Sequence, residues 1–82
     1  MSWLVNVYAD VPNLVVSKPL IEASPLFTDW ESVGGAERRI TLQIDDAEDA
    51  DSACQQAKDE IERVLGENLG SVKDAAATAL DT

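Results

Sequence analysis

A strand pattern followed directly by a long helix pattern constrains the fold of this chain more than any other feature. In residues 38–45, "RRITLQID", the apolar residues Ile40, Leu42 and Ile44 alternate with polar ones, which is typical of a strand with one buried and one solvated face. From about 48 to 65, small and apolar residues recur every three or four positions. This pattern predicts a long helix that packs across one face of a sheet.

The other segments predict further strands and two short helices. Residues 2–11, "SWLVNVYADV", carry large apolar side chains on both faces, as a central strand does, and 14–17, "LVVS", predict a short edge strand between prolines. A serine followed by proline predicts a helix near 25–33, and an alanine-rich stretch after a capping box predicts another near 71–80. The predicted class is α+β, with a small, mostly antiparallel sheet of about three strands and one long helix.

The composition argues against most classes of enzyme. The 82 residues make one small domain, 1–82, without histidine and with Cys54 as the only cysteine. A single chain therefore cannot form an internal disulfide, a histidine-based catalytic pair or the usual four-ligand zinc site. We expect a protein that is not an enzyme and that has no metal and no cofactor. Cys54 is predicted to be a small hydrophobic residue on the buried stripe of the long helix.

The sequence shows no targeting or membrane signal. Its first ten residues, "MSWLVNVYAD", lack the basic start and the long apolar run of a signal peptide. No window approaches the 18 or so apolar residues that a membrane-spanning helix needs. Together with the lone cysteine, this leads us to expect a cytoplasmic protein.

Negative charge is concentrated in the second half of the chain. The formal net charge is −10, and residues 41–82 hold eleven acids and three bases, a net of −8. Such a protein is repelled by nucleic acids and by anionic membranes and is attracted to basic surfaces. We therefore expect neither direct binding of nucleic acid nor binding to membranes.

The most acidic segment is residues 45–51, "DDAEDAD", with five carboxylates in seven positions. Its place before the long helix allows one or two of them to stabilise the helix N-terminus. The spacing does not fit a calcium-binding EF-hand loop, because Ala53 and Cys54 occupy the positions of a ligand and of the required glycine when the loop starts at Asp49. The remaining carboxylates either form a solvated face, as throughout an acid-rich proteome, or bind a partner.

The leading functional hypothesis is a non-enzymatic protein that binds a basic surface of a partner protein. Such a protein could inhibit the partner by covering a nucleic-acid-binding site, as phage-encoded inhibitors and DNA mimics do; this point is an analogy. Phe27 and Trp30 share one face of the predicted 25–33 helix, where they serve either as apolar anchors for the partner or as part of the core. The candidate partner-binding residues are Asp45, Asp46, Glu48, Asp49, Asp51, Asp59, Glu62, Phe27 and Trp30.

Two other functions are compatible with the sequence. The chain could be a small structural or regulatory subunit, such as a homodimer, in which 14–17 or 38–44 extends a sheet across an interface and the acids only keep the protein in solution. A metal-binding domain or an enzyme that uses carboxylates is the third reading, and no motif supports it.

Overall fold

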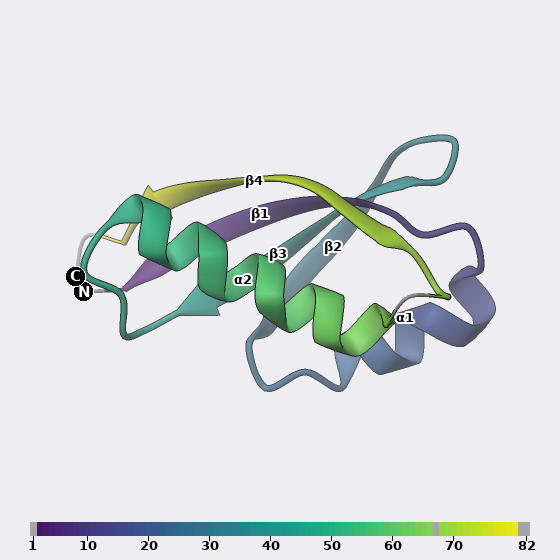
Figure 1. Ribbon diagram of the computed structural model, residues 1–82, viewed down its shortest axis with the longest axis horizontal. Helices are drawn as coiled ribbons and strands as arrows, with labels where there is room; N and C mark the ends of the chain where they lie inside the picture. Colours follow the sequence, from purple (N-terminus) through teal and green to yellow (C-terminus); the bar gives the residue numbers. More distant parts are fainter. Residues whose placement is uncertain (1, 67, 81–82) are drawn as a thin grey trace.

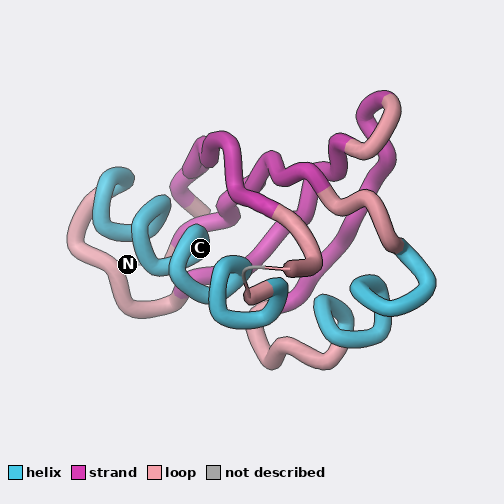
Figure 2. Tube along the Cα trace, turned by 45° about the vertical axis from the view of Figure 1, so that its right-hand side comes forward, coloured by secondary structure: helices cyan, strands magenta, loops and turns pink. Residues whose placement is uncertain are grey.

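The computed structural model describes residues 2–66 and 68–80 as one sheet covered on one face by two helices (Figures 1 and 2). The elements, in chain order, are β1 (Trp3–Asp10), α1 (Leu14–Glu22), β2 (Phe27–Gly34), β3 (Glu37–Ile44), α2 (Ala50–Leu65) and β4 (Ser71–Ala79). The sheet is antiparallel throughout, with the strand order β2-β3-β1-β4. The α+β class and the antiparallel sheet are confirmed, with four strands in place of about three.

The strand order combines two β-α-β units. In the first unit, β1-α1-β2, the strand β3 lies between β1 and β2; in the second, β3-α2-β4, the strand β1 lies between β3 and β4. Each unit is thus a split β-α-β unit of the kind that occurs in ferredoxin-like folds. As a consequence, β1 and β3 are central, and β2 and β4 form the two edges of the sheet.

The core lies between the sheet and the helices. Alternate residues of the central strands, such as Val5 in β1 and Leu42 in β3, are fully buried on the helix side. On α2 the buried stripe begins with Ala53 and Ala57, whose small side chains let the helix lie close to the strands, and it ends with larger residues. The buried apolar residues are Val5, Val7, Ala9, Val11, Ile21, Ile40, Leu42, Ile44, Ala47, Ala53, Ala57, Ile61 and Leu65.

The long helix is closed at both ends by residues that suit these positions. The side chain of Asp49 accepts a hydrogen bond from the backbone N–H of Ser52 at 2.8 Å, so Asp49 is the N-cap. Gly66 follows the last helical residue with a φ of 64°, a conformation that favours glycine. The predicted helix at about 48–65 is confirmed as Ala50–Leu65. Cys54 is half-buried and packs against the core.

The predicted helix near 25–33 is wrong, because this segment forms strand β2. A tight turn at Gly35, where φ is 55°, connects this segment to β3, and the two strands pair along their backbones. The register shifts between Phe27 and Asp29, and again between Ser32 and Gly34. These irregularities interrupt the alternation of inward and outward residues, so the segment does not show the two-residue period of a regular strand.

The predicted helix near 71–80 is also wrong, because this segment forms strand β4. Alanine has the highest intrinsic helix propensity, but pairing with β1 supplies backbone hydrogen bonds along the whole segment. Ala75, Ala77 and Ala79 alternate with more exposed residues and lie half-buried on the helix side. Their small side chains fit beneath α2, so tertiary packing outweighs the local preference.

The strand predicted at 14–17 forms the first half of α1, which includes Pro19. A proline inside a helix removes one backbone hydrogen bond, and here the residue lies on the exposed side.

The strand predicted at 38–45 is confirmed as β3, but it is paired on both sides. Neither 14–17 nor 38–44 can therefore extend the sheet across an interface. Among the described strands, β2 and β4 are the two at the edges of the sheet.

Candidate partner-binding surface

Five exposed carboxylates gather at one end of the molecule. They lie on the loop between β3 and α2 and on the first turn of α2, near the start of β1 and the end of β4 (Figure 1). The molecule measures 35 Å along its long axis, and this loop lies at one extremity. We call this group the acidic pole; it consists of Asp45, Asp46, Glu48, Asp49 and Asp51.

No basic residue lies close to the acidic pole in the sequence or in the sheet register. The stretch 40–57 contains no lysine or arginine, and the paired ends of β1 and β4 contain none either. The bases lie toward the other end or midway along α2: Lys18, Arg38, Arg39, Lys58, Arg63 and Lys73. Among the described residues, the ion pairs join bases to acids outside the pole. Within residues 2–66 and 68–80, no base therefore neutralises the negative charge of the pole.

Core contacts hold the backbone of the acidic pole in place. The side chain of Ala47, in the middle of the loop, is buried in the core, and its carbonyl oxygen accepts a hydrogen bond from the indole N–H of Trp3 at 3.2 Å. The amide of Gln56 donates to the carbonyl oxygen of Asp46 at 3.1 Å. The carboxylate of Asp45 accepts from Gln43 at 2.7 Å. The pole is therefore an ordered surface that extends from the core.

The structure gives only some of these carboxylates a local structural role. Asp49 caps α2, and Asp51 lies in its first turn, where the helix dipole favours negative charge. Asp45 accepts hydrogen bonds from side chains of neighbouring segments. The carboxylates of Asp46 and Glu48 have no such role among the described hydrogen bonds. Their exposure beside three other acids raises the local negative potential without any visible benefit to the fold.

The uncovered face of the sheet is also acidic, but its charges are partly neutralised. Arg39 on β3 forms an ion pair with Glu31 on β2. Lys73 on β4 lies 3.2 Å from Glu37 and 3.6 Å from Asp10. The hydrogen bond from Lys73 to Glu37 and the nearby charge of Asp10 raise the pKa of Lys73. This face therefore presents less unbalanced charge than the acidic pole.

The other candidate acids lie further along α2. Asp59 and Glu62 are exposed, but they follow Asp51 by eight and eleven residues, a distance of about 12 and 17 Å at 1.5 Å per residue. Lys58 and Arg63 are their direct neighbours in the sequence. The structure thus brings five of the seven candidate acids together and separates these two from them by more than the usual screening length of about 8 Å.

The two candidate aromatic residues lie on β2 and not on a helix. Phe27 pairs with Leu42 and Trp30 with Ile40, so both lie on the helix side of the sheet, where they are half-buried and pack against the core. The ammonium group of Lys18 lies 5.4 Å from the centre of the Trp30 ring, within the range of a cation–π interaction. Neither residue pairs with a residue of the acidic pole.

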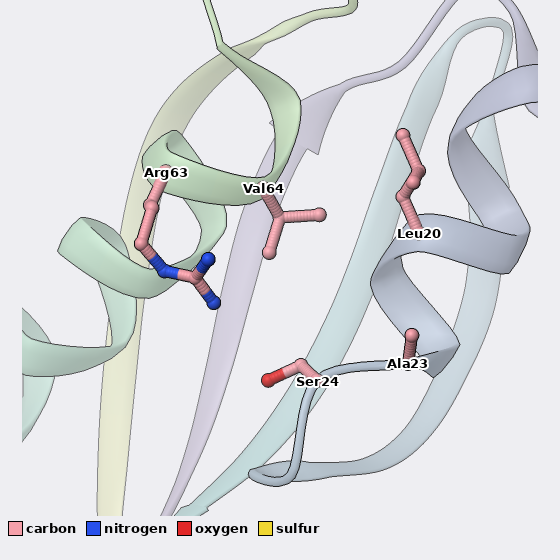
Figure 3. A pocket seen from close by; sticks show the side chains of 5 residues that line it. All are labelled: Leu20, Ala23, Ser24, Arg63 and Val64. Atoms are coloured by element: carbon pink, nitrogen blue, oxygen red, sulfur yellow. The ribbon is translucent and has the colours of Figure 1, made fainter.

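A shallow hollow separates α1 from the C-terminal half of α2 (Figure 3). Its volume is about 250 Å³, and its walls are Leu20, Ala23, Ser24, Arg63 and Val64. Leu20 and Val64 face each other from the two helices, and the hydroxyl of Ser24 and the guanidinium of Arg63 provide the polar side (Figure 3). The hollow is smaller than the 300–1,000 Å³ typical of small-molecule sites.

Glu60 connects the two sides of this hollow. Its carboxylate accepts hydrogen bonds from Ser24 at 2.5 Å and from Arg63 at 2.9 Å. Burial raises the pKa of Glu60, but the hydrogen bonds from Ser24 and Arg63 and the charge of Arg63 outweigh burial and lower it. The three-residue spacing of Glu60 and Arg63 is visible in the sequence. The contact with Ser24, 36 positions away, has no sequence signal.

Comparisons with protein-family models, with curated proteins and with solved structures give no match for this chain. Among the described residues, no group of three or more acidic or cysteine side chains is arranged to hold a metal ion. Neither α1 nor α2 is long and apolar enough to cross a membrane.

Proposed function

We propose that this protein acts without catalysis, by binding a basic surface of a partner protein through the acidic pole. The observation that carries the proposal is the separation of charge along the molecule. Five exposed carboxylates gather at one end, and all six bases lie elsewhere. Because these acids are close to one another, their potentials add over the screening length of about 8 Å and attract a basic surface.

The order of the acidic pole favours binding further. Ala47 is anchored in the core, and Trp3 and Gln56 hold the loop backbone. A surface that is already ordered loses little conformational entropy on binding, so more of the interaction energy contributes to affinity. Partner proteins that bind the phosphates of nucleic acid present a basic surface of the required kind. We therefore propose that the protein inhibits such a partner by covering that surface.

Two variants with equal net charge test this proposal. The pole variant carries Asp46→Asn, Glu48→Gln, Asp49→Asn and Asp51→Asn. Asparagine caps a helix about as well as aspartate, so α2 keeps its N-cap. The control variant carries Glu22→Gln, Asp29→Asn, Asp59→Asn and Glu62→Gln, which are exposed and lie outside the ion pairs of the described residues. Each variant loses four negative charges.

The wild-type protein and both variants are used to capture partners from cell extract at about 100 mM and about 500 mM salt, over which the screening length falls by about half. We expect a specific partner at low salt that is lost at high salt and lost by the pole variant. The control variant should retain this partner. Excess duplex DNA should release the partner from the wild-type protein, because both compete for the same basic surface. Equal loss in both variants, or capture that resists high salt, would overturn the proposal.

A further inference from the structure

The C-terminal half of β4 leaves one edge of the sheet unprotected, whereas its first half carries Lys73, Asp74 and a register shift. In the described part of the chain, β4 pairs with β1 alone, so alternate backbone N–H and C=O groups point away from the sheet. From Ala75 to Ala79 this edge carries no charged residue, no proline and no register shift. Natural proteins commonly use those devices to prevent pairing with another strand. Their absence from Ala75–Ala79 leaves this half of the edge open to pairing with another strand.

The opposite edge, β2, shows what a protected edge looks like in the same molecule. Asp29 and Glu31 place exposed carboxylates along it. Its register shifts between Phe27 and Asp29, and again between Ser32 and Gly34, which bend the strand away from regular pairing. Of these two edges, the Ala75–Ala79 half of β4 is therefore the better suited to receive another strand.

We propose that the Ala75–Ala79 edge pairs with the same edge of a second copy of this chain, giving a homodimer with a continuous eight-stranded sheet. Two identical strands related by a two-fold axis perpendicular to the sheet run antiparallel, which is the arrangement of a self-complementary interface. Alanine and threonine side chains let two strands approach without steric conflict. Ala76 and Thr78 of both copies then lie on the same uncovered face, because they pair with Asn6 and Leu4, which alternate with buried residues of β1.

The charge distribution fits this second copy despite the net charge of −10. The acidic pole lies at the C-terminal end of β4, since the N–H of Leu80 donates to the carbonyl of Ser2 and the hydroxyl of Ser2 donates to Asp45. Antiparallel pairing places the two poles at opposite ends of the interface, roughly 20–30 Å apart at 3.3 Å per residue. This separation exceeds the screening length of about 8 Å, so the poles repel each other weakly.

In the antiparallel dimer, the start of one β4 lies beside the end of the other, so the two poles do not meet. Lys73 remains paired with Glu37 and Asp10 of its own chain. A parallel arrangement would place the two poles side by side.

The mass in solution, with paired charge variants, tests this inference. The chain has a mass of 8.8 kDa, and we expect sedimentation or light scattering to give twice that value. The variants Ala76→Lys with Thr78→Lys, and Ala76→Glu with Thr78→Glu, should each be monomeric, because like charges then face each other across the axis. An equimolar mixture of the two should restore the dimer as a heterodimer. Such a rescue cannot come from a merely unfolded variant.

The matched control puts the same charges on the other edge. Thr28→Lys with Ser32→Lys changes two exposed residues of β2 and should leave the dimer intact. A wild-type mass of 8.8 kDa at all concentrations, dissociation by the β2 control, or a mixture that stays monomeric would overturn the inference. The inference does not depend on the proposed function: the pole variant should remain dimeric, and edge variants should still bind a basic surface.

Discussion

The indole N–H of Trp3 donates a hydrogen bond to the carbonyl oxygen of Ala47 at 3.2 Å, and this bond joins the first strand to the middle of the acidic pole. The two residues are 44 positions apart in the chain. Ala47 itself is buried, so the loop is fixed at its centre while the carboxylates on either side remain exposed. The acidic surface therefore depends on a core contact for its shape.

Trp3→Phe should loosen the acidic pole. Phenylalanine keeps most of the apolar contact but cannot donate the hydrogen bond, so we expect a loss of about 1 kcal/mol in the free energy of unfolding. Amide hydrogen exchange of residues 46–49 should become faster, while that of β3 should not change. Trp30→Phe is the control, because no described hydrogen bond uses the Trp30 indole. Unchanged exchange at 46–49 would show that this bond does not order the loop.

Asp49 should stabilise α2 as a cap and not through its charge alone. Asp49→Ala removes the acceptor of the Ser52 N–H and should lower the free energy of unfolding by about 1 kcal/mol. Asp49→Asn keeps an acceptor and should cost much less. Urea unfolding of both variants measures this difference. A cost for the asparagine variant equal to that of the alanine variant would contradict the capping role.

The network around Glu60 should make stability depend on acid pH. Since the pKa of Glu60 is lowered in the folded protein, ionised Glu60 contributes stability at pH values above its unfolded pKa. This contribution is lost as pH falls through the folded pKa, below the ordinary range of glutamate. Ser24→Ala removes a hydrogen bond to the carboxylate and should cost about 1.5 kcal/mol at neutral pH.

The difference between wild type and Ser24→Ala should therefore shrink as the pH falls through that acid range. Urea unfolding at a series of pH values measures it. Ser32→Ala changes an exposed serine without a described hydrogen bond and is the control. A difference that stays constant down to acid pH would mean that Ser24 acts through packing and not through ionised Glu60.

Gly70 should tolerate no side chain. A Cβ at this position would overlap the carbonyl oxygen of Asp10 and press on the side chain of Leu65. We expect Gly70→Ala to destabilise the protein by roughly 2 kcal/mol or more, because backbone would have to move. Gly34 has open space around its Cβ position, so Gly34→Ala should change stability by less than about 1 kcal/mol. Thermal unfolding compares the two, and equal effects would contradict this packing.

The parts of the fold that could be predicted are those with an uninterrupted local pattern. The period of two in Ile40, Leu42 and Ile44 identified β3, and the spacing of small residues identified α2. The register shift beside Phe27 hid the pattern of β2. The alanines of β4 favour a helix in isolation, and only pairing with β1 makes them a strand. These two errors arose because the deciding contacts are tertiary.

The same limit applies to the candidate site. The cluster 45–51 was visible as composition, and its capping role followed from its place before a helix. The absence of bases around it in space depends on which ends of β1, β3 and β4 meet, and this requires the topology. Asp59 and Glu62 share the helix with the pole, but their distance from it follows only from the length of α2.

Titration with a short lysine-rich peptide, followed by the backbone amide signals of wild type, pole variant and control variant, tests the central claim most directly. The proposed function predicts that wild-type signals shift mainly at residues 45–56 and at Ser2. It also predicts that the pole variant binds at least tenfold more weakly, a difference of about 1.4 kcal/mol, and that the control variant binds as wild type does. Shifts centred on Asp29, Glu31 and Asp74 of the uncovered sheet face, or equal weakening in both variants, would contradict it.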